Sequence, residues 1–415
     1  TTYFNLLTSA SYKDRYEYPE VIQTVLDMKT NTISMDEGNK KLAALAGTDV
    51  RDEFSSLFFR PENHKKATLS FQNTSRNNTI RASLMALKSN TFAKGDTKNQ
   101  FITNINNTFK PVNWFSISVG MNISFTKDEQ NGVDIRDLQY IPQMSRILGD
   151  DGEYLPMIKQ NVDFYYDLPT QKRRDLVEAN DLPYDWDWNL KREVDNTDIT
   201  DNRKDIRLNA AVTLKPFKPL SIDISYQHQN NSGLFSNYLN EQTWYVRDAV
   251  LKYYRAATGT FPIPVGGMLY EQRSSFTSDN GRLQAVYSNN FGEHALRVLA
   301  GTEIRSDYRE SIPYGFYGYD PQSLTQITAL NFQDRITPFL SGKTGATIYP
   351  IPTLRATSIN IRGRNDRYLS YYGNIGYTFR NRYDVTGSVR LDQTNLYGRS
   401  ASYRELPQWS FGGGY

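Results

Sequence analysis

The sequence predicts an all-β fold in which antiparallel strands form part of a membrane-spanning barrel, and three observations support this prediction. Mean hydropathy is low, and no apolar run is long enough for a membrane helix. Apolar and polar residues alternate strictly along many segments of the length that a barrel strand requires. The connections between these segments alternate between short and long.

The composition allows strands, and not helices, to cross a membrane. Of the 415 residues, 38% are hydrophobic, and mean hydropathy is −0.62. A membrane helix needs about 20 consecutive apolar residues, whereas a tilted strand needs only about 9–11 residues with one apolar face. Aromatic residues make up 13% of the chain, with 29 Tyr and 21 Phe, which suits a protein whose rings lie at membrane interfaces.

Cysteine and charge content exclude several kinds of site and partner. The chain has no Cys, so disulfide bonds and thiolate zinc sites are impossible. Its 48 basic and 45 acidic residues give a net charge of +3 and are dispersed, so nucleic acid is not an expected partner. We expect no cofactor.

Strict alternation is the main indication of strands. In residues 115–126, Phe115, Val119 and Ile123 fall on one face, and Ser116 and Ser124 fall on the other. The same pattern is clear in 206–215, 220–227, 369–380 and 383–392, and weaker in 3–12, 67–75, 79–88, 100–110, 281–291, 294–305 and 406–415. The chain therefore contains about twelve strands, each expected to pair antiparallel with its neighbours.

The connections favour a barrel over a soluble β-sandwich. Every second connection is a tight turn, and the longest of the others span about 13–66, 128–202, 232–280 and 306–366. Outer-membrane barrels have short periplasmic turns and long extracellular loops, whereas sandwiches rarely carry such insertions. We therefore expect residues 1–415 to form one partial barrel domain, with helix within 19–47 of the first long loop.

Two stretches resemble the SusC/RagA family of TonB-linked outer-membrane transporters. The first stretch comprises Gly47–Asp52, Phe58 and Phe59, Asn63 and His64, Ala67–Phe71 and Ser83–Leu87, and it is similar to the family's entry into its barrel. The second stretch comprises Asn381–Asp392, Tyr397 and Gly398, and Leu406–Ser410, and it is similar to the mid-barrel signature. One departure lies at Gln72–Ser75, where the family usually has Ser-Gly-Gly.

The resemblance implies a fold and a function. Family members form a barrel of about 22 strands around an N-terminal plug. They import oligosaccharides or oligopeptides across the Gram-negative outer membrane, together with TonB and a SusD-like surface lipoprotein. About twelve strands cannot close such a barrel, so we expect this chain to be its first half, without the plug and the C-terminal strands.

Two alternatives belong to other classes of protein. A SusC-like barrel could serve as a structural scaffold in an outer-membrane complex, or the chain could be a soluble secreted all-β enzyme or adhesin. The sequence offers little for catalysis, since it has no Cys and no Gly-x-Ser-x-Gly motif, and its three histidines, His64, His228 and His294, are widely separated. We therefore predict a non-enzyme.

Aromatic residues in the long loops are the candidates for ligand contact, because exposed rings stack on sugars or pack against peptide side chains. They are Trp186, Trp188, Trp244, Tyr245, Tyr253, Tyr254, Tyr317 and Tyr319. Packing of these rings between loops, or against a lipoprotein, is the alternative interpretation and the favoured one. Asp150, Asp151 and Glu153 are weak candidates for a calcium site, since their spacing does not match a Ca²⁺ loop.

Overall fold

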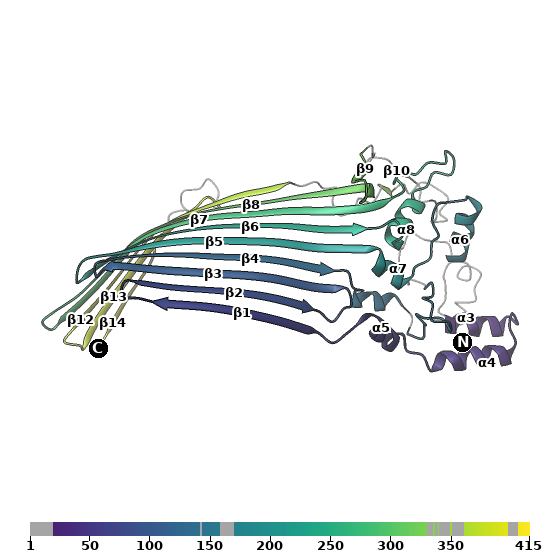
Figure 1. Ribbon diagram of the computed structural model, residues 1–415, viewed down its shortest axis with the longest axis horizontal. Helices are drawn as coiled ribbons and strands as arrows, with labels where there is room; N and C mark the ends of the chain where they lie inside the picture. The colour runs from purple at the N-terminus through teal and green to yellow at the C-terminus, as the bar shows by residue number, and fades with distance from the viewer. Residues whose placement is uncertain are drawn as a thin grey trace.

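The computed structural model describes residues 20–141, 143–157, 170–328, 330, 335–336, 339, 349–350, 361–396 and 406–415. Strands dominate these residues and form one long, curved sheet, while the helices gather at one of its ends (Figure 1). The strand predicted at 3–12 lies outside the described residues.

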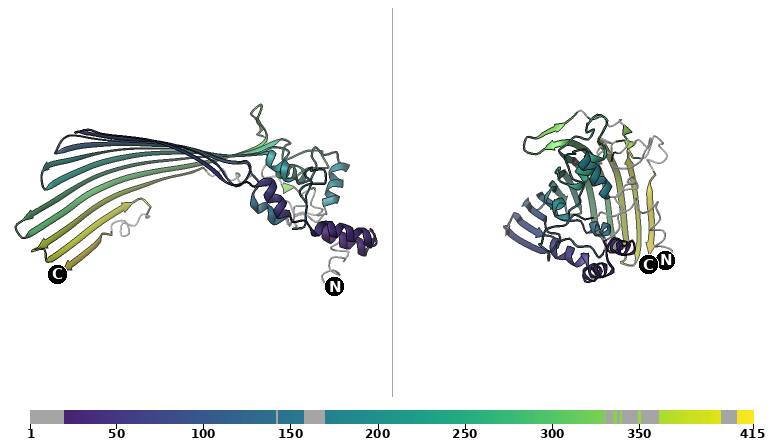
Figure 2. Two further views of the ribbon diagram at one scale, coloured as in Figure 1. Left: turned by 60° about the horizontal axis from the view of Figure 1, so that its bottom comes forward. Right: turned by 90° about the vertical axis from the view of Figure 1, so that its right-hand side faces the viewer.

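The sheet has 12 strands in sequence order, and all neighbours are antiparallel. The strands are β1 (Asn63–Thr74), β2 (Asn78–Asn90), β3 (Asp96–Val112), β4 (Phe115–Gln130), β5 (Thr197–Phe217), β6 (Leu220–Leu239), β7 (Gly267–Phe291), β8 (His294–Asp320), β9 (Thr325–Ile327), β12 (Arg362–Phe379), β13 (Tyr383–Thr394) and β14 (Gln408–Gly414). A separate ladder pairs β10 (Arg335–Ile336) with β11 (Tyr349–Pro350). Viewed along its length, the large sheet curls into an open trough (Figure 2).

The helices lie at the end of the sheet that carries the long connections, and together with these connections they form what we call the cap (Figure 1). They are α3 (Glu20–Lys29), α4 (Met35–Ala46), α5 (Val50–Phe58), the 3-10 helix η1 (Ile135–Tyr140), α6 (Thr170–Ala179), α7 (Leu190–Asp195) and α8 (Trp244–Lys252). Side chains cap their first turns: Ser34 accepts from the Glu37 amide, and Asp49 accepts from the Arg51 amide. The helix expected within 19–47 is confirmed as α3 and α4. In the described part of the chain, no helix has the length and apolarity needed to span a membrane.

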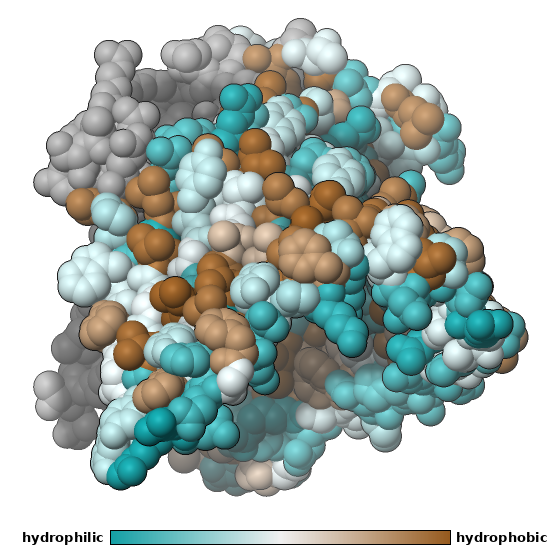
Figure 3. All heavy atoms as spheres, turned by 90° about the vertical axis from the view of Figure 1, so that its left-hand side faces the viewer, coloured by the Kyte–Doolittle hydropathy of each residue, from teal (hydrophilic) through white to brown (hydrophobic). Residues whose placement is uncertain are grey.

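Strand register places most of the apolar residues of neighbouring strands on one face. One row across the sheet runs from Phe109 through Ile117, Val212 and Ile224 to Leu283, and each residue is paired with the next. We call this the outer face and the opposite one the inner face. Seen from the end with the short turns, hydrophobic side chains form a band across the molecule, with hydrophilic ones beside it (Figure 3).

The outer face is open in the structure. Val119 is 48% exposed, Ile224 is 46% exposed and Ile304 is 63% exposed, and many other large apolar residues of this face are also exposed. Soluble proteins rarely expose a contiguous apolar surface of this extent, since its contact with water is unfavourable. A sandwich would cover it with a second sheet, and the described residues form only the separate two-stranded ladder besides the large sheet. The all-β barrel prediction is confirmed, and the outer face is the one that contacts lipid.

The eleven other predicted strands are confirmed as β1 to β8 and β12 to β14, but the predicted ends of several are wrong. The loops expected at about 13–66, 128–202, 232–280 and 306–366 are shorter, because β1 begins at Asn63, β5 at Thr197 and β7 at Gly267, while β6 continues to Leu239 and β8 to Asp320. These extensions carry polar residues on both faces, so alternation does not mark them. Ladder hydrogen bonds to the neighbouring strands still satisfy their backbones.

Replacing Val119 by Arg tests the assignment of the outer face. Val119 lies in the middle of the apolar segment of β4, and Arg at mid-bilayer costs about 2–4 kcal/mol on a lipid-facing position. The matched control is Ser118→Arg, which places the same charge on the inner face and should change the free energy of unfolding by less than about 1 kcal/mol. Urea unfolding in lipid vesicles measures both. Equal losses for the two variants would contradict the assignment.

Candidate functional site

The inner face of the sheet is polar and internally hydrogen-bonded. Asn122 donates to Asn104, which donates in turn to Ser83 at 3.4 Å, so one chain of side chains links three strands. A Cβ at Gly120 would lie only 2.5 Å from the Asn209 amide nitrogen, so glycine leaves the space that this side chain occupies. Amide and hydroxyl groups of this kind suit a water-filled interior, and they would be costly if they faced lipid.

Charged residues concentrate on the inner face of β7, β8, β12 and β13. We call this set the inner charged cluster, and it comprises Arg282, Glu303, Arg305, Asp307, Arg390 and Asp392 together with Tyr368 and Tyr372. Strand register brings them together, since Arg282 pairs with Glu303, Arg305 pairs with Tyr368, and Tyr372 pairs with Arg390. Arg305 and Tyr368, which are 63 positions apart in the chain (368 − 305), are thus direct neighbours.

Ion pairs hold the cluster in place and leave part of each guanidinium open. Arg305 binds Asp307 through two nitrogen atoms, and Ser278 donates to Asp307 at 2.6 Å. The Asp307 side chain is 1% exposed, whereas that of Arg305 is 43% exposed. Arg282 contacts Glu303 at 2.9 Å, and Arg390 contacts Asp392 at 2.8 Å. The carboxylates orient the arginines, and the arginines remain available to a polar ligand.

Two tyrosine rings complete the cluster. The Arg305 guanidinium lies 5.4 Å from the ring centroid of Tyr368, and that of Arg390 lies 5.8 Å from Tyr372. The Tyr372 hydroxyl donates to Gln284 at 3.2 Å. Gly301 makes room for this ring, because a Cβ there would lie 2.5 Å from it. The cluster can therefore offer charge, hydrogen bonds and flat apolar faces to one ligand.

The inner charged cluster was not among the residues predicted from the sequence. Ligand contact was expected in the long loops, whereas the residues of this cluster lie within strands. The sequence does contain a signal for this cluster, because charged residues occupy the polar positions of the alternating segments. Arg390 and Asp392 flank Leu391, and Glu303 and Arg305 flank Ile304.

Five of the eight aromatic candidates are buried in the core of the cap. Trp186, Trp188, Trp244, Tyr253 and Tyr317 belong to one hydrophobic cluster with residues of α5, α7 and α8. The rings of Trp186 and Trp244 meet edge to face, with centroids 5.6 Å apart, and the Trp186 indole donates to Asp248 at 3.1 Å. Burying a large ring stabilises a fold by roughly 3 kcal/mol. The burial of these five rings favours packing between loops.

The other three aromatic candidates are more accessible. Tyr245 is 43% exposed. The Tyr254 ring lies 5.0 Å from Phe261 and 5.2 Å from Phe339, and Tyr319 lies 5.8 Å from Tyr238. Ligand contact by these three residues stays a prediction.

The calcium candidates lie in one turn of the cap. Asp150 accepts a hydrogen bond from Arg146 at 2.6 Å, and the Glu153 carbonyl accepts from the Gly149 amide. Among the residues that the structure describes, no group of three His, Asp or Glu side chains is arranged to hold a metal ion. The three histidines are far apart, on β1, β6 and β8.

Arg247 of α8 organises the polar part of the cap core. Its side chain is 1% exposed. It donates to the carbonyls of Gln242 at 3.0 Å, Asp185 at 2.9 Å and Asp187 at 2.6 Å, and also to the Asp185 carboxylate. Burial lowers the pKa of Arg247, and Asp185 opposes this change. The group remains charged, because free arginine titrates far above neutral pH.

Two other cap groups have shifted pKa values. Burial raises the pKa of Asp185, but the hydrogen bond from Arg192 and the charge of Arg247 outweigh it, so the net pKa is below the usual value. Burial raises the pKa of Tyr184, whose hydroxyl donates to Glu241 at 3.0 Å and accepts from the Gly266 amide. At neutral pH, Asp185 is therefore ionised and the Tyr184 phenol is neutral.

An apolar outer face, a polar inner face, short turns at one end and a folded cap at the other define part of the wall of an outer-membrane β-barrel. No protein-family model and no curated protein matches the chain. Solved structures do match. The RagAB peptide transporter is similar with a TM-score of 0.60 and 14% identity, over 87% of this chain and 35% of that chain.

Two further structures of the RagAB peptide importer match in the same way. The open-open state gives a TM-score of 0.59 at 14% identity, over 87% of this chain and 34% of that one. The closed-closed state gives a TM-score of 0.55 at 16% identity, over 88% of this chain and 35% of that one. This chain spans about a third of the length of these structures. The resemblance to SusC/RagA barrels is confirmed at the level of the fold.

Replacing Arg247 by Met should destabilise the cap by about 3–5 kcal/mol, because the carbonyls of Gln242 and Asp185 lose their buried donor, and the Asp185 carboxylate and the Asp187 carbonyl keep only their other donors. Lys191→Met is the control: Lys191 forms an exposed ion pair with Asp195 within α7, and its loss should cost less than about 1 kcal/mol. Limited proteolysis with peptide mapping measures both. Cleavage within the cap that is no faster in R247M than in K191M would contradict this role.

Acid should loosen the cap through Asp185. The pKa of this group is depressed in the folded protein, so its stabilising contribution is present above its ordinary pKa of 3.8 and is lost as the pH falls through the lower folded value. Cap proteolysis by pepsin between about pH 2 and 5 should therefore accelerate toward the acid end. Asp185→Asn should be less stable at neutral pH and show a shallower acid dependence. If the rate of cap proteolysis depends on pH in D185N as it does in the parent protein, groups other than Asp185 cause the loosening in acid.

Proposed function

We propose that this chain forms part of the barrel of a TonB-dependent outer-membrane importer. The observation that carries the proposal is the continuous apolar outer face opposite a polar, charged inner face, within the fold of the RagAB transporter barrel. An apolar wall holds the barrel in lipid, and a polar interior lets a hydrated ligand pass. The outer membrane of a Gram-negative bacterium is the corresponding location.

The proposed ligand is a polar oligomer, either an oligopeptide or an oligosaccharide. The inner charged cluster supports this chemistry, because Arg282 and Arg390 can bind carboxylate or hydroxyl groups and Tyr368 can pack against a peptide side chain or a sugar ring. The RagAB neighbour is a peptide importer, which favours the peptide of the two. A surface lipoprotein of the SusD type is the proposed partner at the cap, and TonB supplies the energy.

Paired substitution of the open arginines tests the proposal. In the complete protein, Arg282→Gln with Arg390→Gln should lower uptake of labelled oligopeptides about tenfold, since hydrogen bonds from charged groups contribute about 1.5–3 kcal/mol. The control is Lys110→Gln with Lys218→Gln, which removes the same charge near the short turns and should leave uptake unchanged. Uptake is measured in intact cells with and without TonB.

The outcomes separate the alternatives. Loss of uptake in the paired arginine variant and in cells without TonB supports import, and repeating the assay with labelled oligosaccharides identifies the ligand class. Uptake of neither ligand, in cells that insert the protein normally, would favour the scaffold function over import.

A further inference from the structure

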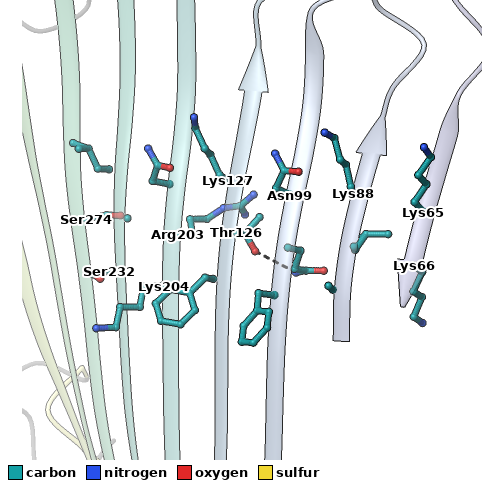
Figure 4. Close-up of a pocket in the computed structure, with 18 of the residues that line it drawn as sticks. Lys65, Lys66, Lys88, Asn99, Thr126, Lys127, Arg203, Lys204, Ser232 and Ser274 are labelled. Carbon is teal, nitrogen blue, oxygen red and sulfur yellow. Dashed lines mark hydrogen bonds between the residues drawn. The ribbon is translucent and has the colours of Figure 1, made fainter. Parts of the chain in front are cut away.

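Four lysines follow the edge of the apolar band on the outer face of β1 to β5. We call them the basic row: Lys65, Lys88, Lys127 and Lys204. Register aligns Lys65 with Lys88, Lys88 with Asn99, and Asn99 with Lys127, and Lys204 lies two residues from Asn202, the partner of Lys127. Figure 4 shows Lys65, Lys88, Asn99 and Lys127 side by side on adjacent strands, with their side chains extending in one direction. All four lysines are exposed.

The basic row lies directly beside the last apolar residues of the lipid-facing surface. On the same face, one step nearer the short turns, are Ala67, Ala86, Phe101 and Phe125, which are aligned by register. Apolar stems can therefore lie along the hydrocarbon edge while the ammonium groups reach the headgroup layer. Because the cap is at this end of the strands, the row faces the leaflet on the cap side.

A groove of about 980 Å³ connects the row to the apolar band. Its lining includes all four lysines, the small residues Ala67 and Ala86, and the rings of Phe101 and Phe125 (Figure 4). The small residues make its floor beside the bulky rings. The groove is thus basic at its cap-side edge and apolar toward the middle of the membrane.

The charge of the row is only partly balanced by neighbouring groups. Lys127 contacts Glu129 at 2.6 Å, and Glu129 also accepts a hydrogen bond from Thr97. Lys204 lies 5.9 Å from the ring centroid of Phe125. Four lysines against Glu129 and Asp198, whose charge also acts on Lys127, leave an excess of two positive charges (4 − 2) on the cap-side edge of these strands.

Register continues this line of residues from Lys127 through Asn202 and Leu234 to Arg273 on β7, which also lines the groove. Nearer the short turns on the same face, His228 of β6 and Asp279 of β7 contact each other at 2.8 Å. Asp279 also accepts from the Tyr226 hydroxyl at 2.6 Å. Asp279 lies nearer the short turns than Arg273 on the same strand, so positive charge prevails at the cap-side edge, where it attracts anions.

We propose that the basic row binds the phosphate groups of an anionic lipid in the cap-side leaflet, with an acyl chain of the same molecule in the groove over Ala67 and Ala86. The position of the lysines at the hydrocarbon edge selects a lipid over a soluble anion, because the acyl chain contacts the apolar floor. This inference depends on the membrane orientation of the outer face and not on what the barrel transports.

The test compares a diphosphorylated glycolipid, lipid A, with its dephosphorylated form in detergent micelles containing the complete protein. The variant Lys65→Gln, Lys88→Gln and Lys204→Gln should bind lipid A about 100-fold more weakly, since each basic residue near an anionic surface contributes roughly fivefold. The control Lys110→Gln, Lys215→Gln and Lys218→Gln removes equal charge near the short turns and should bind within about twofold of the parent. Calorimetric titration gives the affinities, and thermal unfolding verifies that both variants fold.

Binding of lipid A that requires both its phosphates and the basic row supports the proposal. Equal weakening in the two triple variants would overturn it, because the effect would then be one of net charge. Equal affinity for the dephosphorylated lipid would overturn the phosphate contact. Displacement of lipid A by inorganic phosphate at concentrations near the lipid affinity would identify a free-anion site and not a lipid site.

Discussion

The structure depends on an unbroken antiparallel ladder from β1 to β14. In hydrocarbon, a backbone amide or carbonyl without a partner costs several kcal/mol, so each strand is held by its two neighbours. Once pairing is fixed, the two-residue period assigns every side chain to lipid or to the interior. Both faces, the inner charged cluster and the basic row follow from this single constraint.

The ladder also explains how distant parts of the chain build one surface. Arg282 and Arg390 reach the same region of the inner face because β7, β8, β12 and β13 are consecutive in the sheet. Strands β8 and β12 pair directly, although residues 321–361 separate them in the chain. Charge placed on strands is held more rigidly than charge on loops, which suits residues that must meet a ligand in a fixed geometry.

The sequence predicted the fold well where one face of a strand meets lipid and the other meets water. Phe115 to Phe125 illustrate this, since each apolar residue there has a polar neighbour. Prediction failed where water meets both faces. Stretches such as 271–280 and 306–311 contain few apolar residues, and only pairing with the adjacent strand reveals that they are extended.

The site was predicted less well, for two physical reasons. Aromatic residues in loops can contact a ligand or pack in a core, and the sequence does not distinguish these two roles. Trp188 is buried, for example, whereas Tyr245 is exposed. Register decides which charges become neighbours on the inner face, and register across a connection as long as 321–361 is not written in any local motif. Arg305 and Tyr368 are adjacent only because β8 and β12 pair with this particular offset.

The lengths of β7 and β8 have a mechanical consequence. These strands contain 25 and 27 residues, whereas about 9–11 are enough to cross a bilayer, so more than half of each extends beyond the lipid. A hydrogen-bonded sheet resists bending far better than separate loops. The extended parts of β7 and β8 therefore connect the cap rigidly to the barrel wall. A force on the cap is transmitted through these strands into the wall, whereas flexible loops would absorb it.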